Sequence, residues 1–581
     1  MTNADIARRF EEFAAILEIL GANKFKVIAF QKVARTLDGM ADEAADLAKT
    51  KGALEAIDGI GASSAEKIRE LVTTGKIAEL DELRAKVPAG LLDLLGVSGL
   101  GPKTIKLLWE EGGVVDRASL KAKLATGELS SLPRMGEKTL KNIAESLALS
   151  EQSAGRIRLG EAMPIAEFVV AHMERVPGVE RVAYAGSLRR GKETIGDIDV
   201  LCAAKDPQAA HAAFRALPDI AKVLVSGETK TSVVTNRGVQ IDLRTLPLAS
   251  FGAALMYFTG SKEHNVKLRE RAIAMGCRLN EYGLFPDDGE NAPQHRGVKP
   301  IAAATEEDVF RALKLAWVPP ELREDRGEIP AAEKSALPPL VQLADLKADL
   351  HAHTRASDGV MTIEELVAAA RAKGFHTIAV TDHSKASVQA NGLSVERLRE
   401  HVCAIRAVAA STKDMNVLAG SEVDILSDGR LDYDDETLAL LDLVVASPHI
   451  ALKQSPADAT ARLVRAIEHP KVRILGHPTG RIINGRPGLE PDMKEVIRAA
   501  KANDVALEIN ANPLRLDLRD THVKAAVDAG CLIAIDCDAH SREHFEFAIY
   551  GILTGRRGWL TKEQCVNCWS QERLAAWIGR K

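Results

Sequence analysis

The stretch Ala185-Gly186-Ser187-Leu188-Arg189-Arg190-Gly191-Lys192-Glu193-Thr194-Ile195-Gly196-Asp197-Ile198-Asp199 decides the fold of the middle of this chain. Val182-Ala183-Tyr184 before it predicts a strand, Gly186-Ser187 a tight turn, and Ile198-Asp199-Val200-Leu201 the next strand. Side chains two positions apart on a strand point to the same face, so Asp197 and Asp199 should lie side by side. Two adjacent carboxylates repel each other unless a cation lies between them.

A third acid follows in another apolar strand, Val239-Gln240-Ile241-Asp242-Leu243. Three converging carboxylates suit two divalent metals that hold the oxygens of an in-line displacement at phosphorus. The Gly186-Ser187 turn offers backbone N–H groups to phosphate oxygens, and Arg189 and Arg190 follow it directly. A bare Asp-x-Asp could be an acidic surface turn, but the glycine turn and the third acid favour a phosphoryl-transfer site.

Composition sets limits without choosing a function. With 581 residues the chain has room for several domains, and its net charge of −5 shows no overall basic field for nucleic acid. Any nucleic-acid contact must therefore come from local sites. No apolar run approaches the roughly 18 residues of a membrane span, so no membrane partner is expected. Seven scattered cysteines favour a reducing compartment, which predicts a cytoplasmic location.

A short unit recurs among residues 1–150, where Ile6, Phe10, Phe13, Ile16 and Leu17 stand at the spacing of an amphipathic helix. The unit is a glycine-containing hairpin before a predicted helix, seen at Ile57-Asp58-Gly59-Ile60-Gly61, Val97-Ser98-Gly99-Leu100-Gly101 and, more weakly, Leu132-Pro133-Arg134-Met135-Gly136. The glycines let the backbone approach a partner, and each helix start offers N–H donors to an anion. One copy could be an ordinary capped helix turn, whereas three copies resemble the helix-hairpin-helix motif, which binds DNA phosphates.

The last part of the chain, residues 346–581, holds 11 of the 15 histidines. Its short apolar runs alternate with helical stretches and end in possible metal ligands: His351, His353, Asp358, Asp382, His383, Glu422, His449, His477, Glu508, Asp538 and His540. The carboxyl ends of successive parallel strands meet at one mouth of a barrel, so these side chains should converge. Mixed His, Asp and Glu ligands suit Zn²⁺, Mn²⁺ or Fe rather than Ca²⁺. Scattered core histidines are the alternative.

Residues 1 to about 325 resemble the family X DNA polymerases, the family of DNA polymerase beta, and the rest resembles the polymerase and histidinol phosphatase (PHP) domain. The resemblance implies a multidomain α and α/β protein with helical helix-hairpin-helix domains, a nucleotidyltransferase palm with a thumb-like domain, and a distorted (β/α)₇ barrel. The expected domains are an 8 kDa-type helical domain (1–85), a fingers-like helical domain (86–155), the palm (156–250), the thumb-like nucleotide-selection domain (251–325), a proline-containing linker (326–345) and the PHP domain (346–581). Such a linker predicts two parts with independent cores.

The resemblance assigns roles in the palm. It implies two Mg²⁺ ions on Asp197, Asp199 and Asp242, with Asp242 helping to activate the primer 3′-hydroxyl. The residues implied in nucleotide binding are Gly186, Ser187 and Arg190 for the triphosphate, Tyr257, Phe258 and Gly260 for the deoxyribose, and Asn265 and Arg269 for the minor-groove edge.

In the helical domains the resemblance implies DNA contacts at Gly59, Gly61, Gly99, Gly101, Lys26 and Lys32. Lys67 matches the lysine that forms a Schiff base with an abasic sugar in polymerase beta. That chemistry requires a lysine with a lowered pKa, as burial beside other cations produces. An ordinary solvated helix lysine is the alternative.

In the PHP domain the resemblance implies three ions, Mn²⁺ or Zn²⁺. The first is held by His351, His353, Glu422 and Asp538, the second by Glu422, His449 and His477, and the third by Asp358, His383 and His540. Bacterial family X polymerases use this domain as a 3′–5′ exonuclease, with related abasic-site (AP) endonuclease and 3′-phosphatase activities.

The expected function is gap-filling DNA synthesis in base excision repair, with a separate nuclease site. The expected partners are gapped or primer-template DNA and dNTPs, and the chain is expected to act as a monomer at the nucleoid. Two alternatives remain open. One is a DNA-binding nucleotidyltransferase-like protein whose main activity is PHP phosphoesterase, and the other is a DNA-binding scaffold with decayed sites.

Overall fold

A computed structural model describes residues 3–38, 44–57, 59–97, 100–133, 135–137, 139–141, 143–144, 147, 156–290 and 292–579. They fall into two compact units: one of residues 1–154 with 484–486, and one of residues 155–483 with 487–581. Each unit is described by itself below.

The first unit is a bundle of short helices around one apolar core. Its described helices are α1 (Asn3–Ile19), α2 (Lys24–Asp38), α3 (Ala44–Leu47), α4 (Ala62–Thr74), α5 (Ala78–Arg84), α6 (Gly90–Asp93), η1 (Leu94–Gly96), α7 (Pro102–Glu110), α8 (Arg117–Thr126) and η2 (Glu128–Ser131). Phe10 and Phe13 of α1 pack on Phe30 of α2, with the Phe13 and Phe30 rings 4.5 Å apart. All five residues of the predicted amphipathic stripe are buried, which confirms that helix.

The helices predicted after the first two glycine hairpins are present. Helix α4 begins directly after Gly61 and α7 directly after Gly101, and among the described contacts no side chain caps either start. Their first backbone N–H groups are therefore available to an external anion. Gly99, and Arg134 in the weaker third copy, lie outside the described residues.

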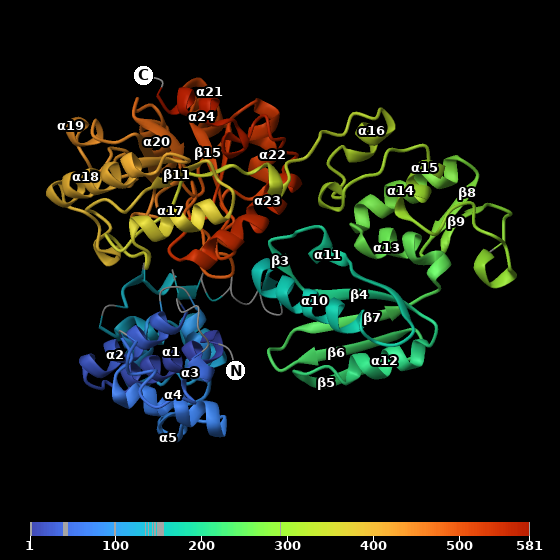
Figure 1. The fold of residues 1–581 in the computed structure, drawn as a ribbon. Coiled ribbons are helices and arrows are strands. Elements are labelled where there is room, and N and C mark those ends of the chain that lie inside the picture. The colour runs from blue at the N-terminus through green and yellow to red at the C-terminus, as the bar shows by residue number, and fades with distance from the viewer. Residues whose placement is uncertain are drawn as a thin grey trace. The chain divides into compact units, whose positions relative to one another are not determined.

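The second unit starts with the palm, a five-stranded mixed sheet in the order β2-β4-β7-β6-β5 (Figure 1). Its elements are β1 (Ile157–Arg158), α10 (Leu159–Met173), β2 (Val179–Tyr184), α11 (Gly186–Arg189), β3 (Thr194–Ile195), β4 (Asp197–Ala204), α12 (Pro207–Arg215), β5 (Ile220–Ser226), β6 (Lys230–Thr235) and β7 (Gln240–Thr245). The predicted strands on both sides of the glycine turn are confirmed. The turn itself is a single helical turn, α11.

A mainly helical segment follows the palm. It contains η3 (Leu248–Ser250), α13 (Phe251–Thr259), α14 (Lys262–Ala274), β8 (Cys277–Asn280), β9 (Gly283–Pro286), η4 (Pro293–Arg296), α15 (Glu306–Ala312), η5 (Pro320–Leu322) and α16 (Glu328–Glu333). Its core is separate from that of the palm and includes Met256, Leu268 and Phe310.

The C-terminal part is a barrel of seven parallel strands in sequence order, surrounded by helices (Figure 1). The strands are β10 (Ala348–Asp349), β11 (Thr377–Val380), β12 (Asn416–Asp424), β13 (Leu443–Ser447), β14 (Val472–Leu475), β15 (Ala506–Asn510) and β16 (Ile533–Asp536). The helices are η6 (Leu343–Asp345), α17 (Ile363–Ala372), η7 (Val388–Ala390), α18 (Val395–Ser411), α19 (Asp435–Leu438), α20 (Pro456–Ile467), α21 (Met493–Ala502), α22 (Asp520–Ala529), η8 (Arg542–Phe547), α23 (Ala548–Arg557), η9 (Val566–Cys568) and α24 (Gln571–Ile578). The predicted (β/α)₇ architecture is confirmed.

Side chains close the seam between the first and last barrel strands. Asp536 Oδ1 accepts from the backbone N–H of Leu350 (2.7 Å), and Asp349 Oδ2 accepts from that of Cys537 (3.0 Å). Asn567 donates to Asp536 Oδ1 (2.7 Å) and to the backbone oxygen of Ala348 (3.1 Å). Directly after the two strands the backbone also pairs, with the His353 N–H donating to the Ala539 oxygen (2.8 Å) and the Ala539 N–H to the His351 oxygen (3.3 Å). Side-chain and backbone bonds together join β10 to β16.

The palm and the barrel share an interface, contrary to the expectation of independent cores. Tyr550 and Leu516 of the barrel belong to the apolar cluster of the palm. Arg481 of the barrel donates to Glu193 of the palm at 2.7 Å. Residues 326–345, predicted as a linker, are themselves packed, since the Val341 N–H donates to the Leu560 oxygen at 2.9 Å. Damage in one part can therefore reach the other.

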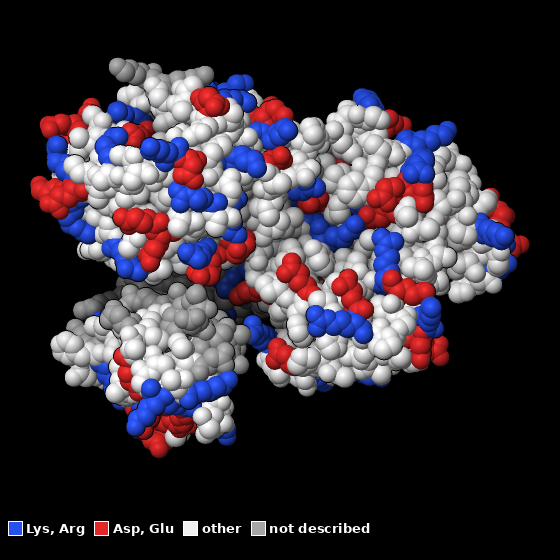
Figure 2. Space-filling model, viewed as in Figure 1, with Lys and Arg blue, Asp and Glu red and all other residues white. Residues whose placement is uncertain are grey.

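The surface carries charges of both signs. On the face drawn in Figure 2, lysines and arginines are interspersed with acidic side chains and form no single basic field. Among the described residues, no helix is both long and apolar enough to cross a membrane.

Candidate active sites

The palm brings its three predicted acids together. Strands β4 and β7 are parallel neighbours, and their register places Asp199 directly beside Asp242. Oxygens of Asp197, Asp199 and Asp242 lie within 4.8 Å of one another. Asp197 is exposed and Asp242 is buried, so the cluster opens to solvent on one side.

The charges of this cluster are only partly balanced. Burial, followed by the charges of Asp197 and Asp242, raises the pKa of Asp199 to about 6. Lys230 Nζ lies 2.6 Å from Asp242 Oδ2. Although burial opposes it, hydrogen bonds from Lys230, Ser232 and Gln240 hold the pKa of Asp242 below its ordinary value. The acid cluster therefore attracts cations.

The glycine turn lies against these acids. The N–H of Ala185 donates to the backbone oxygen of Asp199 at 2.8 Å, which fixes the turn to β4. Gly186 has a φ of +63°, and a Cβ there would lie 2.5 Å from Asp199 Oδ2. Only glycine therefore fits both this backbone conformation and this close approach. Ser187 follows, half-buried, within α11.

The two arginines of the turn have different surroundings. Arg189 makes a two-pronged contact with Glu306, at 2.7 and 2.8 Å, so its guanidinium ties the palm to α15. Arg190 donates from Nε to Glu324 (2.8 Å) and from Nη1 to the Thr259 oxygen (2.6 Å). The sequence predicts that both arginines lie near the phosphate. In the structure, Arg189 instead forms an internal ion pair with Glu306.

The predicted nucleotide-selecting residues lie on α13 and α14. The rings of Tyr257 and Phe258 are half-buried and 5.2 Å apart. Asn265 donates to the Tyr257 oxygen at 2.6 Å. Arg269 follows one helical turn later on the same face. Gly260 ends α13 with a φ of +73°, and a Cβ there would lie 3.1 Å from Arg190 Nη1.

The barrel gathers all nine of its predicted ligands. Three groups have ligand atoms within 4.8 Å: His351, His353 and Asp538; His383, Glu422 and His449; and His353, Asp358, His383 and His540. The ninth residue, His477, places Nε2 2.8 Å from Glu422 Oε1. His477 and Asp538 adopt positive φ values, +23° and +51°, which cost energy for residues other than glycine and are typical of functional sites.

Histidines and carboxylates balance one another in the barrel. Against the effect of burial, Glu422 and Asp358 raise the pKa of His383 to about 11. Burial, together with His540 and His383, lowers the pKa of His353 to about 4. Despite burial, the surrounding histidines hold the pKa of Glu422 well below its ordinary value, so it remains a carboxylate.

A second layer of acids orients these ligands. Glu508 Oε1 lies 2.6 Å from His351 Nδ1, and Glu508 Oε2 accepts from the N–H of His477. Asp424 lies 3.1 Å from His449 Nδ1. Asp382 accepts from Thr354 and Ser357 in the loop that carries Asp358. Such contacts fix the ring orientation and tautomer of a metal ligand.

Both donor sets fit divalent metals. In the barrel, His351 Nε2, both ring nitrogens of His353 and Glu422 Oε2 are buried without a hydrogen-bond partner among the described residues. Buried polar atoms of this kind need a partner, and a mixed N and O donor set suits Zn²⁺ or Mn²⁺. The palm set contains only carboxylates, which suits Mg²⁺.

The predicted lyase and DNA-contact lysines are partly paired. Glu79 on α5 lies 2.8 Å from Lys67 Nζ and 2.6 Å from Lys26 Nζ. The neighbourhood of Lys67 therefore includes a carboxylate, whereas the lyase chemistry calls for neighbouring cations. Gly59 has a φ of +97°, and a Cβ there would meet Thr36 and the Lys32 side chain. A Cβ at Gly61 or Gly101 would meet nothing within 4 Å.

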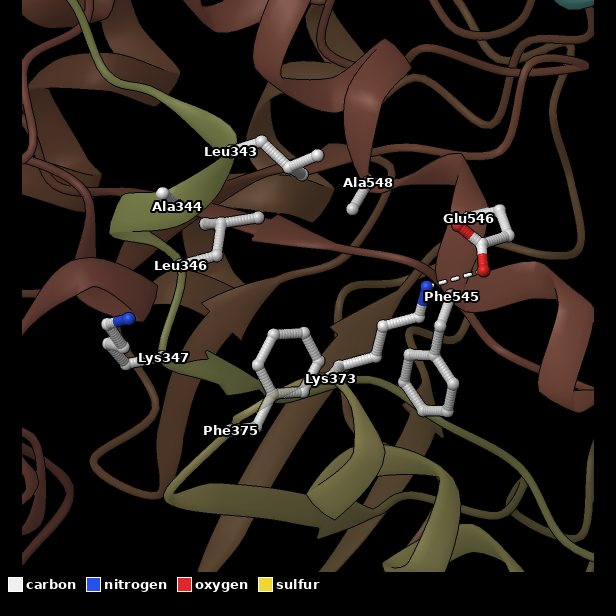
Figure 3. A pocket seen from close by; sticks show the side chains of 9 residues that line it. All are labelled: Leu343, Ala344, Leu346, Lys347, Lys373, Phe375, Phe545, Glu546 and Ala548. Carbon is white, nitrogen blue, oxygen red and sulfur yellow. Dashed lines mark hydrogen bonds and ion pairs between the residues drawn. The ribbon is translucent and has the colours of Figure 1, made fainter.

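A cavity of about 460 Å³ lies away from these clusters (Figure 3). Leu343, Phe375 and Phe545 line it, and Lys373 pairs with Glu546 at its edge. It contains none of the predicted site residues.

Sequence reasoning missed the residues that support both sites, among them Lys230, Glu324 and Asp424. The sequence pattern counts Glu508 and Asp382 among the possible metal ligands, whereas the structure places them as acids that contact the ligands or the loop of Asp358. A sequence signal that could find the supporting acids of the barrel is a carboxylate at or near the end of a barrel strand. Asp424, the last residue of β12, fits this pattern.

Comparison with known proteins agrees with this geometry. Family profiles match the helix-hairpin-helix domain at 1–77, the SAM-like helix-hairpin-helix tandem at 91–148, the DNA polymerase beta palm at 156–243, the DNA polymerase beta thumb at 254–324 and the PHP domain at 349–512. The site and fold define a nucleotidyltransferase palm joined to a PHP metal centre.

The chain is 35% identical to the DNA polymerase/3′-5′ exonuclease PolX of Bacillus subtilis (strain 168) over 583 residues, which covers 100% of each chain. It is 28% identical to DNA polymerase lambda of Rattus norvegicus over 55% of this chain and 56% of that one. A probable phosphatase of Shewanella sp. (strain ANA-3) is 30% identical over 33% of this chain and 75% of its own. The chain therefore belongs to the family X DNA polymerases that carry a C-terminal PHP domain.

Proposed function

We propose that this protein fills short gaps in DNA during repair and removes nucleotides from the 3′ end at a second site. The observation that carries the proposal is the register of β4 and β7, which sets Asp199 beside Asp242 at the Gly186 turn. Full-length similarity to a polymerase and exonuclease supports both activities. We place the protein in the cytoplasm, acting as a monomer on gapped or primer-template DNA.

In the palm, Asp197, Asp199 and Asp242 would hold two Mg²⁺ ions, which neutralise charge that develops on the phosphate oxygens. Asp242 forms an ion pair with Lys230 in the structure and would face the primer 3′-hydroxyl. The Gly186-Ser187 turn and Arg190 would orient the triphosphate. Tyr257 and Phe258 would pack on the sugar, and Asn265 and Arg269 would meet the minor-groove edge of the new pair.

In the barrel, the nine ligands would hold three ions, Mn²⁺ or Zn²⁺, which supply Lewis-acid activation of water and of the phosphodiester. Glu508, Asp424 and Asp382 keep the ligands in place. The same site would act on abasic sites and 3′-phosphates, a reading supported by the similarity to a probable phosphatase.

The N-terminal unit would bind the DNA flanking the gap through the backbone at Gly59, Gly61, Gly99 and Gly101, with Lys26 and Lys32 toward the 5′-phosphate. Backbone donors explain how a chain of net charge −5 binds DNA. Lys67 would act as the lyase nucleophile once it leaves its ion pair with Glu79.

A crossed pair of variants tests the proposal. On DNA with a one-nucleotide gap, dNTPs and Mg²⁺ or Mn²⁺, Asp199→Ala should lose gap filling and keep 3′–5′ degradation. Glu422→Ala should lose degradation and bound metal and keep gap filling.

Gap filling at wild-type rate by Asp199→Ala would show that the palm acids do not carry polymerisation. A wild-type protein that degrades 3′ ends but never extends a primer would instead support the phosphoesterase alternative.

A further inference from the structure

Arg557, on barrel helix α23, reaches the glycine turn of the palm. Its Nη1 donates to the backbone oxygen of Arg190 (2.7 Å) and to Glu324 Oε1 (2.9 Å), and its Nη2 donates to Asp520 Oδ2 (2.7 Å). The Arg557 side chain is only 3% exposed. Three acceptors and burial thus fix this guanidinium.

Glu324 connects Arg557 to Arg190. Glu324 Oε1 accepts from Arg190 Nε at 2.8 Å as well as from Arg557. Against burial, the charges of Arg557 and Arg190 hold the pKa of Glu324 below its ordinary value, so it stays ionised. Arg190 also donates from Nη1 to the Thr259 oxygen. Nε and Nη1 of Arg190 are thus used in these bonds, and Nη2 can donate to another acceptor.

We propose that Arg557 is a positioning residue for nucleotide binding, through which the barrel holds Arg190 in the orientation that meets the incoming triphosphate. The inference rests on the proposed role of Arg190. A guanidinium already fixed by its neighbours loses less conformational freedom when it binds phosphate, so the complex is tighter. The PHP domain then contributes to polymerisation as well as to its own reaction.

The preceding residue on the same helix provides a matched control. Arg556 donates from Nε to Glu321 at 2.7 Å and from Nη1 to the Val341 oxygen at 3.1 Å. These bonds join the barrel to Glu321 in the thumb segment and do not involve Arg190. Arg557→Lys and Arg556→Lys both weaken domain contacts, but only the first disturbs Arg190.

The test measures the KM for dNTP and kcat in single-nucleotide gap filling by the full chain. Lysine cannot reproduce a planar fork with three acceptors, so Arg557→Lys should raise KM about tenfold with kcat within about twofold. Arg556→Lys should leave KM within about twofold of wild type. If Arg557→Lys does not fold, Glu324→Gln replaces it, with the same expected rise.

Double substitution separates the inference from the role on which it rests. If Arg557 acts through Arg190, Arg190→Lys with Arg557→Lys should have the KM of Arg190→Lys alone. An unchanged KM in Arg190→Lys would overturn the proposed role of Arg190. If Arg190→Lys raises KM, three results would overturn only the positioning role of Arg557. They are a wild-type KM in Arg557→Lys, an equal rise of KM in Arg556→Lys, or additive effects in the double variant.

Discussion

The palm and the barrel gather their ligands in opposite ways. The palm acids come from two adjacent strands, and one of the acids, Asp197, is exposed. Lys230 and Arg244 offset part of their negative charge. The barrel ligands follow six of its seven strands, and the remaining strand, β15, supplies the supporting Glu508. They are mostly buried, and each carboxylate meets histidines.

This difference teaches how each site relates to its metals. The palm has excess negative charge and few supporting contacts, so we expect its ions to arrive with the nucleotide. The barrel is nearly balanced in charge and supported by a second layer, so we expect its ions to remain bound between reactions.

The largest expected effect comes from a variant that disables the palm site and leaves the barrel site intact. Asp242→Asn should lower the gap-filling rate about 10³-fold, equivalent to about 4 kcal/mol of transition-state stabilisation, because a central carboxylate charge is lost. Primer extension and 3′–5′ degradation are measured on the same preparation. Glu180→Gln, on an exposed position of neighbouring strand β2, is the control. Loss of both activities would mean that the two sites do not act separately.

A second variant tests the supporting layer of the barrel. Glu508→Gln should weaken metal binding about 10- to 100-fold, because an amide has no charge and cannot accept from both His351 Nδ1 and the His477 N–H. Titration with Mn²⁺ and metal content after gel filtration measure the change. Glu495→Gln, on exposed α21, should bind metal as wild type does. Unchanged affinity in Glu508→Gln would show that the first ligands need no support.

A third change tests the proposed DNA contact at Gly101. Valine at Gly101 has free space in the structure, so the fold should survive while a DNA backbone is pushed away. Affinity for gapped DNA should fall about tenfold, close to the value of one or two hydrogen bonds, with alanine giving a smaller loss. Barrel hydrolysis of a small phosphodiester should not change. Equal binding by the valine and wild-type proteins would leave Gly101 as an ordinary helix start.

The smallest effect concerns pH. His211 on α12 is buried in the palm, with Nε2 3.0 Å from Thr245 Oγ1 and Nδ1 2.9 Å from Thr231 Oγ1. Burial lowers the pKa of His211. The unfolded chain therefore binds this proton more readily, so palm stability should fall as pH drops below about 6.5. Melting curves at pH 5.5 and 7.5 should differ less for His211→Gln than for wild type. His172→Gln, half-buried on α10, should keep the wild-type difference.

The sequence predicted what local patterns determine. The Gly186 turn, the Asp197 and Asp199 pair and the strand-end histidines each follow from the spacing of neighbouring residues, and the structure brings each set together. Contacts between distant segments carried no such pattern. The Arg557–Glu324 pair joins residues with no shared periodicity, and prolines at 330, 338 and 339 indicated a linker where the chain is packed. Ion pairs between domains depend on tertiary geometry, which spacing does not reveal.

The side-chain seam of the barrel has a consequence for the order in which the protein matures during translation. Asp536 and Asn567 join the first barrel strand to the last, and Asp538 and His540 complete two of the three ligand groups. A nascent chain that has not yet released these residues from the ribosome cannot complete the ligand groups of its barrel. Arg557 emerges in the same final segment. Synthesis of residues 536–567 is thus needed for both the proposed nuclease site and the proposed support of Arg190, so a chain terminated before this segment would lack both.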